Sequence, residues 1–138
     1  IEYQIRWAID QGLADSRLQR DCQQIIDSID QLLAGRDRPT SLIHGDLWSG
    51  NYWCGSDRRP VIVDPAVYYG DPESDLAMTR LFGGFGPAFY DAYAAHTPPA
   101  AGSHNRSDLY QLYHVLNHLN LFGSAYLGRA QELINKLL

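Results

Sequence analysis

The spacing of apolar residues changes abruptly near Pro39, and this change limits the fold more than any other feature of the sequence. Before it, apolar residues recur every three or four positions, first over residues 1–13 and then over residues 18–33, as expected for amphipathic helices. The second helix should end near Gly35. After Pro39, short apolar runs alternate with polar turn residues, which is typical of strands. The chain should therefore contain both helices and strands.

The central part of the chain predicts a β-hairpin. Short apolar runs occupy residues 42–44, 51–54 and 61–63. The last two are separated by residues 55–60, a polar stretch rich in turn-forming residues, so they should pair as neighbouring strands. Beyond Asp64 the pattern becomes helical again.

Helix signals dominate the remainder of the chain. Asp71 followed by Pro72 places an N-cap residue before a first-turn proline, so a helix should begin there and run to Gly83. Further helices are expected over residues 87–95, 107–121 and 124–138, with a hinge at Gly123. We therefore expect a mainly helical α+β fold without internal repeats.

Composition and charge exclude several classes of protein. With 138 residues, the chain suits a single domain over residues 1–138. A net charge of −5 without a basic stripe argues against nucleic-acid binding, and the apolar runs are too short for a membrane helix. The two cysteines, Cys22 and Cys54, form no paired motif, so we expect a cytoplasmic protein. Cys22 falls on the apolar side of its helix and should be a small buried hydrophobe.

Three polar residues suggest a chemical function. Segment 44–51 lies on a predicted loop between two strands, and Asp64 closes the next strand. Phosphoryl transfer needs one carboxylate to orient and deprotonate the attacking hydroxyl, and an amide oxygen with a second carboxylate to hold magnesium on the phosphates. Asp46 suits the first role. Asn51 and Asp64 suit the second, because the interval from Asp46 to Asn51 matches the catalytic loop of kinases.

Each of these residues alone has a simpler explanation. An isolated Asp after Gly, or an isolated Asn, is most often a turn or cap residue, and a His after two apolar residues is most often a core group. Together, the spacing of Asp46 and Asn51 and the position of Asp64 at a strand end favour a phosphoryl-transfer site, since turn residues alone predict neither. His44 would then support the loop.

The same segment resembles a known family. The run His44-Gly45-Asp46-Leu47-Trp48-Ser49-Gly50-Asn51 is similar to the His-Gly-Asp-Leu-Trp-Ser-Gly-Asn motif of the fructosamine (ketosamine) 3-kinases. Residues 63–70, 73–78, 81–85 and 112–120 are similar to that family as well. The related aminoglycoside and choline kinases share only the His-x-Asp-x4-Asn core and a later Asp. The pair Asp71-Pro72 departs from the family, in which many members carry a basic pair.

This resemblance implies a protein-kinase-like, aminoglycoside-phosphotransferase-like fold, of which the chain would be the C-terminal catalytic lobe with a short β-hairpin at the catalytic loop. It implies ATP-dependent phosphorylation, with Mg²⁺, of the 3-hydroxyl of ketosamines, small or protein-bound, whose unstable 3-phosphates then decompose in deglycation. Asp46 would be the base, with Asn51 and Asp64 on magnesium. Asp75 would hold the backbone of the loop; the alternative is a first-turn carboxylate that interacts with the helix dipole.

Two residues are candidates for substrate binding. Trp48 lies two residues after Asp46, and its indole face could pack on a sugar ring; the alternative is a buried loop anchor. His118 resembles a family position that faces the sugar, although His114, one turn earlier, or a core role is the alternative. The glycines of residues 83–86 follow a helix rather than a strand, so we interpret them as a flexible helix junction and not as a phosphate loop.

Two other functions stay open at this point. An aminoglycoside- or choline-type kinase would use the same three residues on another acceptor, and a non-catalytic fragment is the second alternative. No Gly-rich strand-loop-strand, and no strand lysine paired with a helix glutamate, precedes the loop. We therefore expect that the nucleotide-binding N-terminal lobe lies outside residues 1–138. The chain alone should be inactive, with an exposed lobe interface that favours self-association.

Overall fold

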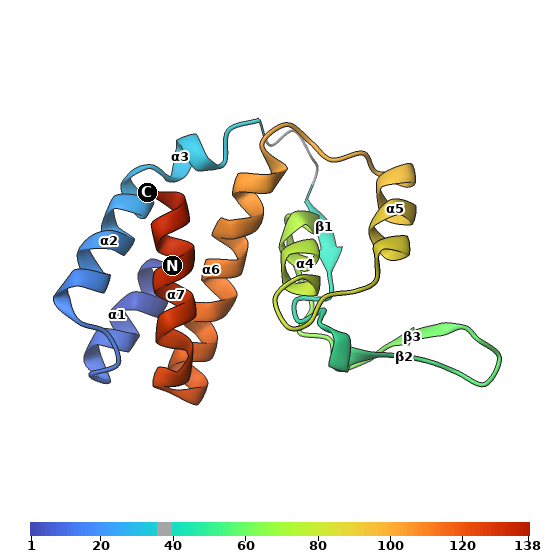
Figure 1. The fold of residues 1–138 in the computed structure, drawn as a ribbon, viewed down its shortest axis with the longest axis horizontal. Coiled ribbons are helices and arrows are strands. Elements are labelled where there is room, and N and C mark those ends of the chain that lie inside the picture. Colours follow the sequence, from blue (N-terminus) through green and yellow to red (C-terminus); the bar gives the residue numbers. More distant parts are fainter. Residues whose placement is uncertain (36–39) are drawn as a thin grey trace. The chain divides into compact units, whose positions relative to one another are not determined.

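The computed structural model describes residues 1–35 and 40–138. Their contacts divide the chain into two compact units. One unit joins Ile1–Ala34 to His104–Leu138, and the other comprises Gly35–Ser103. Most of the described residues lie in helices and the strands are short, which confirms the predicted mainly helical α+β class (Figure 1). None of the described helices is both long enough and apolar enough to span a membrane.

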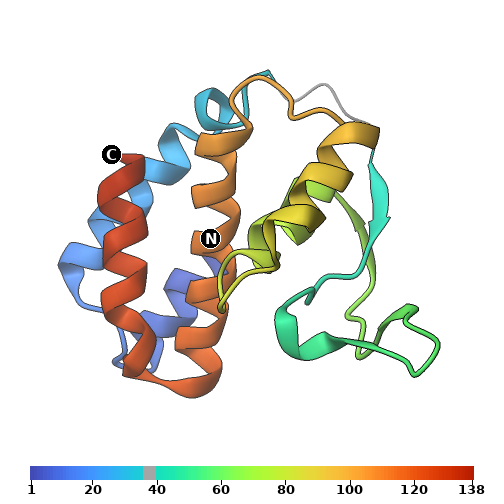
Figure 2. The ribbon, with the colours of Figure 1, turned by 45° about the vertical axis from the view of Figure 1, so that its right-hand side comes forward.

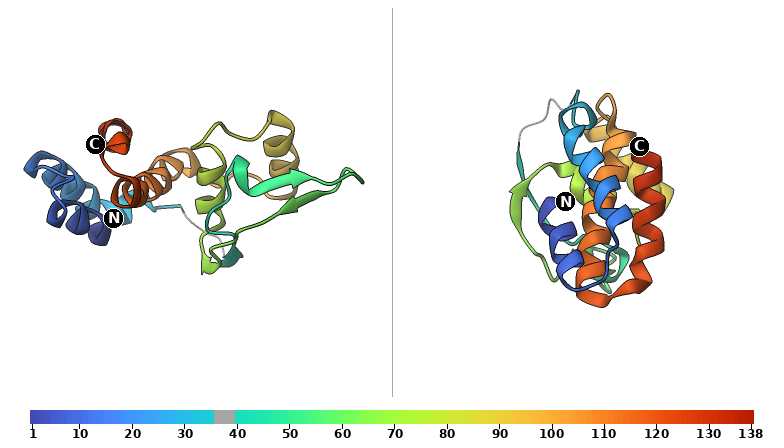
Figure 3. Two further views of the ribbon diagram at one scale, coloured as in Figure 1. Left: turned by 90° about the horizontal axis from the view of Figure 1, so that it is seen from below. Right: turned by 90° about the vertical axis from the view of Figure 1, so that its left-hand side faces the viewer.

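The first unit is a bundle of helices. Its elements are α1 (Glu2–Asp10), α2 (Ser16–Asp27), α3 (Ile29–Leu32), α6 (Ser103–Phe122), the 3₁₀ turn η2 (Ser124–Tyr126) and α7 (Leu127–Leu137). Helix α2 packs against both α1 and α7, as the end-on view in Figure 3 shows. The interior consists of apolar side chains from all the longer helices: Ile5, Ala8, Leu18, Ile25, Leu112, Leu116, Leu119, Leu133 and Ile134. Burial of these side chains is the main stabilising term for the unit.

Two features of α2 test the sequence interpretation. Cys22 is fully buried, and burial raises the pKa of its thiol to about 11, which confirms that it is a core residue and not a reactive thiol. The prediction of a single helix that runs to Gly35 is wrong, because the helix breaks at Ser28. The Ser28 hydroxyl donates to Gln24 O at 3.0 Å and to Ile25 O at 3.1 Å. A side chain that binds the carbonyls of the preceding turn favours such an interruption.

The second unit contains two small antiparallel sheets and two helices. Its elements are β1 (Ser41–Ile43), the 3₁₀ turn η1 (Ser49–Asn51), β2 (Tyr52–Cys54), β3 (Pro60–Ile62), β4 (Tyr68–Gly70), α4 (Pro72–Thr79) and α5 (Pro87–His96). Strands β2 and β3 pair with Trp53 opposite Val61, which confirms the predicted hairpin. Strand β4, which the sequence did not predict, pairs with β1 through Leu42 and Tyr69. Helix α4 packs on β1, as the views in Figures 1 and 2 show.

The start of α4 follows the sequence prediction. Asp71 caps the helix by accepting the Glu73 N–H at 2.9 Å, and Pro72 occupies its first turn. The helix ends at Thr79, four residues before the expected end at Gly83. Both Gly83 and Gly84 have positive φ, which a continuing right-handed helix does not permit. The capped start fixes the first turn of α4 against β1.

Candidate active site

The loop that follows β1 makes a sharp turn at Gly45. Its φ is +82°, and a Cβ at this position would collide with the carbonyl oxygen of Ala66 and lie 2.9 Å from the Ala66 carbonyl carbon. Because the colliding atoms belong to the backbone, no side-chain rotation relieves the contact. Only glycine therefore lets the loop pass this closely beside the segment that leads into β4.

The turn is held by Asp75, in the first turn of α4. The carboxylate of Asp75 accepts the N–H of His44 at Oδ2, 2.7 Å away, and the N–H of Gly45 at Oδ1, 2.9 Å away. Hydrogen bonds to a carboxylate are about twice as strong as those between neutral groups. One side chain thus fixes two successive peptide groups just before Asp46.

The ring of His44 links this loop to the strand that precedes Asp64. Nε2 lies 2.9 Å from Val63 O, and Nδ1 lies 3.3 Å from the Asp46 N–H. A carbonyl can only accept, so Nε2 carries the proton and Nδ1 accepts from Asp46. His44 is buried, with 7% of the residue exposed. His44 therefore supports the loop from within the fold.

Asp46 and Asn51 are in direct contact. The Nδ2 group of Asn51 donates to Asp46 O at 2.9 Å and to Asp46 Oδ2 at 3.0 Å. The amide of Asn51 is buried, whereas Asp46 is half-buried. This leaves Asp46 Oδ1 and Asn51 Oδ1 without a hydrogen bond to any residue that the structure describes. One carboxylate oxygen and one amide oxygen are thus available to ligands.

Asp64 follows β3 and is tied to Asn51 through the neighbouring residue. The Val63 N–H donates to Asn51 O at 3.0 Å. Asp64 itself has a φ of +50°, a left-handed conformation that is uncommon for residues other than glycine and is best tolerated by Asp and Asn. Its side chain is exposed and has no hydrogen bond or ion pair within residues 1–35 and 40–138. The fold thus brings Asp46, Asn51 and the backbone before Asp64 together.

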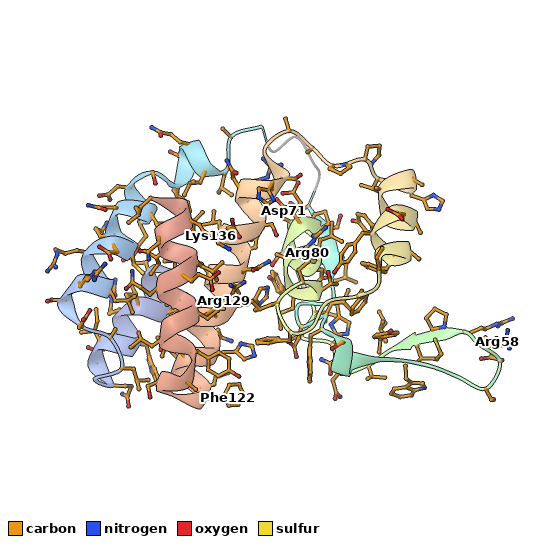
Figure 4. The ribbon with its side chains drawn as sticks, viewed as in Figure 1. Arg58, Asp71, Arg80, Phe122, Arg129 and Lys136 are labelled. Atoms are coloured by element: carbon orange, nitrogen blue, oxygen red, sulfur yellow. The ribbon has the colours of Figure 1, made fainter. Side chains whose placement is uncertain are left out.

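The two candidates for substrate binding lie in different units. Trp48, which is 37% exposed, follows Asp46 in the same loop, and its backbone N–H donates to Asp46 O at 3.2 Å. His118 lies on α6 in the first unit, where its Nδ1 donates to His114 O at 2.8 Å. The His118 ring packs at 5.4 Å on Phe122, which Figure 4 labels, and at 5.3 Å on Tyr126. His114 is buried, so His118 is the more accessible of the two histidines.

Sequence reasoning missed several residues that shape this loop. Gly45 matters because of its contact with Ala66, and Val63 because its carbonyl anchors His44. Phe82, in the segment after α4, meets the Trp48 indole edge-on with ring centroids 6.2 Å apart. The positive φ of Gly45 has no signal in the sequence beyond the glycine itself. The other contacts join positions far apart in the chain.

Replacing Gly45 by Ala tests how the loop is built. The variant should lower the stability of the full-length protein by at least about 2 kcal/mol, because it adds left-handed strain and a collision with backbone atoms. Thermal unfolding measures the change. Gly128→Ala is the matched control, since a Cβ at Gly128 meets nothing within 4 Å and needs no positive φ. Equal melting temperatures for the two variants would contradict the close approach of Gly45 and Ala66.

Comparisons with known proteins identify the family. A model of the family described as fructosamine kinase matches residues 1–138. The chain belongs to the fructosamine kinase family. It is 51% identical over 118 residues to a probable ketoamine kinase of Vibrio parahaemolyticus, covering 86% of this chain and 41% of that protein. It is 43% identical over 136 residues to a chloroplastic protein-ribulosamine 3-kinase of Arabidopsis thaliana, covering 99% of this chain and 41% of that protein.

A solved structure agrees with this assignment. The crystal structure of a candidate fructosamine-3-kinase from Thermobifida fusca superposes with a TM-score of 0.90 at 37% identity, covering 99% of this chain and 47% of that one. The chain therefore spans less than half the length of these fructosamine kinase relatives. The fold of the segment is shared with the family over nearly its whole length.

Proposed function

We propose that the protein containing this chain is an ATP-dependent ketosamine 3-kinase that acts in deglycation. The observation that carries the proposal is the paired arrangement of Asp46 and Asn51, in which the Asn51 amide holds one carboxylate oxygen and leaves the other available. The names of the curated relatives, ketoamine kinase and protein-ribulosamine 3-kinase, supply the acceptor class. The acceptor is a ketosamine, free or attached to a protein.

Asp46 is the base in this proposal. Its Oδ2 is occupied by the Asn51 N–H, which orients the carboxylate, and its Oδ1 can accept the proton of the sugar 3-hydroxyl. The backbone of the loop is held by the bond from the Asp46 N–H to His44 Nδ1 and by the two peptide N–H groups bound to Asp75. These bonds restrict the movement of the Asp46 carboxylate. Such positioning is most of what a protein contributes to phosphoryl transfer. The 3-phosphate product then decomposes and releases the amine.

The donor set near Asp46 fits magnesium. Among the described residues, no group of three or more His, Cys, Asp or Glu side chains could hold a metal. Magnesium on ATP needs fewer protein ligands, because phosphates and waters complete its octahedron. The free Oδ1 of Asn51 and the unpartnered carboxylate of Asp64 are the hard oxygen ligands that it prefers. Bound there, Mg²⁺ with ATP would neutralise the charge on the transferred phosphoryl group.

The chain is proposed to be the catalytic lobe of a kinase-like fold. Its single lysine, Lys136, lies in the last turn of α7, so residues 1–138 offer no lysine on a strand to pair with the phosphates. The hairpin of β2 and β3, with Arg58 at its tip in Figure 4, exposes Trp53 and Ile62 by 53% and 59%. Exposed apolar strands of this kind favour contact with another part of the protein or with a second copy.

Trp48 and His118 are proposed to contact the acceptor. The half-exposed indole of Trp48, in the loop that carries Asp46, offers an aromatic face to a sugar ring or to the substituent on the amine. The His118 proposal rests on the family likeness and on its partial exposure on α6. The bond from Nδ1 to His114 O fixes the orientation of the His118 ring on α6.

An acceptor comparison tests the proposed function. The full-length protein, supplied with ATP and magnesium, should phosphorylate ribulosamine or fructosamine and should leave an aminoglycoside unmodified. Phosphate transfer to each acceptor is measured separately with labelled ATP. Turnover of the aminoglycoside alone would overturn the proposal in favour of the other class of small-molecule kinase.

A further inference from the structure

The indole of Trp48 folds back over its own loop. A Cβ built on Gly50 would collide with Cζ2 and Cη2 of the indole and would lie 2.7 Å from Cζ3. Gly50 lies in η1 and does not have a positive φ, so alanine is compatible with its backbone. The missing side chain of Gly50 is thus what gives the indole its place. An alanine there would displace the ring and leave the loop able to form.

The indole of Trp48 also contacts the ring of Phe82. The two rings meet at an interplanar angle of 81°, a favoured edge-to-face geometry. The Ser49 hydroxyl donates to Phe82 O at 3.1 Å, which ties the same two segments together through the backbone. Trp48 therefore contacts both Gly50 and Phe82, while 37% of the residue stays exposed.

The segment that carries Phe82 is closed at its base by Tyr90 of α5. The Tyr90 hydroxyl accepts the Phe85 N–H at 3.3 Å and lies 3.3 Å from Thr79 O and 3.2 Å from Thr79 Oγ1. Since Thr79 Oγ1 donates to Leu76 O at 2.7 Å, its lone pairs are left to accept from Tyr90. One phenol thus joins the end of α4 to the far end of the segment.

The Tyr90 link is one of the restraints on residues 81–86, beside the Ser49 bond to Phe82 O. Gly83 and Gly84 both have positive φ, and a Cβ on Gly83 would meet nothing within 4 Å. Phe85 is a further anchor of the segment, because its ring packs on Tyr52 at 4.8 Å and on Phe89 at 4.7 Å. These contacts hold residues 81–86, so they set the position of the Phe82 ring and therefore that of the Trp48 indole.

We propose that Gly50, Phe82 and Tyr90 are positioning residues that fix the orientation of the Trp48 indole for the acceptor. The inference rests on the proposed function, because it takes Trp48 to contact the ketosamine. An indole that is already held in its bound orientation loses little conformational freedom when the acceptor binds, whereas a loosened one must be ordered at that moment. The three residues therefore act on acceptor affinity and leave ATP affinity and Asp46 unchanged.

Three variants of the full-length protein test the proposal: Gly50→Ala, Phe82→Leu and Tyr90→Phe. Each should raise the KM for the ketosamine by about 3–10-fold, the loss expected from one loosened side chain. The KM for ATP and kcat should stay within about threefold. Matched controls are Gly86→Ala, where a Cβ meets nothing within 4 Å, and Tyr93→Phe, on the same helix as Tyr90. Neither control should change the KM for the ketosamine.

A fluorescence measurement separates indole orientation from folding. The fluorescence of Trp48 is obtained by subtracting the spectrum of the same variant carrying Trp48→Phe from the spectrum of each variant. This subtraction cancels the fluorescence of all other tryptophans. Acrylamide quenching of the Trp48 fluorescence should increase in Gly50→Ala, Phe82→Leu and Tyr90→Phe and stay unchanged in the controls. A merely structural role would lower the melting temperature without this selective change.

The outcomes separate a failure of the positioning inference from a failure of the proposed function on which it rests. If the wild-type protein phosphorylates no ketosamine, the proposed function fails and the inference fails with it. If the wild-type protein is active but the three variants keep its ketosamine KM and its Trp48 quenching, the inference alone is overturned. An equal rise in the KM values of ketosamine and ATP would also overturn it.

Discussion

In the full-length protein, Asp46→Asn should lower kcat by about 10²–10⁴, the usual contribution of a general base. Asparagine has nearly the same shape as aspartate and can still accept the Asn51 N–H that now binds Asp46 Oδ2. It cannot take up the proton of the 3-hydroxyl. The KM values for ketosamine and ATP should therefore change little, since binding contacts are kept and only the proton acceptor is lost.

Steady-state kinetics with both substrates measure this effect. Asp91→Asn is the matched control, because Asp91 is an exposed carboxylate on α5 with no hydrogen bond or ion pair in the described part of the chain. This control should keep the wild-type kcat. If Asp46→Asn holds kcat within a few-fold and raises the ketosamine KM, then Asp46 binds the acceptor and the role of base is wrong.

A different response is expected from the residues assigned to magnesium. Asp64→Asn and Asn51→Ala should each raise the magnesium concentration needed for half-maximal rate by at least about tenfold, because the first replaces a charged carboxylate ligand by a neutral amide and the second removes an oxygen ligand. Asparagine is the right replacement at position 64, since it tolerates the φ of +50° that an alanine would strain. Excess magnesium should restore part of the rate.

Asn51→Ala should recover less than Asp64→Asn. The Asn51 amide also donates to Asp46 Oδ2. Asn51→Ala therefore removes a metal ligand and also releases the carboxylate of the proposed base. Magnesium titrations of these two variants beside Asp46→Asn make the comparison. The separate roles would be refuted by Asp64→Asn and Asp46→Asn showing the same magnesium dependence.

The helices and the hairpin were predictable because their signals are local. The Asp71-Pro72 pair contains the cap that the structure shows, and the breaker-rich turn after Cys54 specifies the pairing of Trp53 with Val61. Strand β4 had no such signal, since Tyr68–Gly70 is short and becomes a strand only by pairing with β1. The break at Ser28 was hidden because apolar spacing continues through it.

For the candidate site, the sequence could predict residue types but not their contacts. The interval from Asp46 to Asn51 indicated a shared loop, and the structure places the two side chains 3.0 Å apart. That the Asn51 amide would hold the Asp46 carboxylate depends on the turn at Gly45, which in turn depends on the approach of Ala66. The contact between Trp48 and Phe82 joins segments far apart in the chain, and no spacing rule covers it.

The most direct test identifies the oxygen that receives the phosphate and asks whether Asp46 is needed for the transfer. The full-length protein is incubated with ATP, magnesium and either a fructosamine or its 3-O-methyl analogue, which differs only at the proposed acceptor oxygen, and products are followed by ³¹P NMR. We predict a 3-phosphate on the fructosamine that forms with wild-type protein, forms far more slowly with Asp46→Asn, and never forms on the analogue. Equal phosphorylation of the two acceptors, or an undiminished rate with Asp46→Asn, would contradict this prediction.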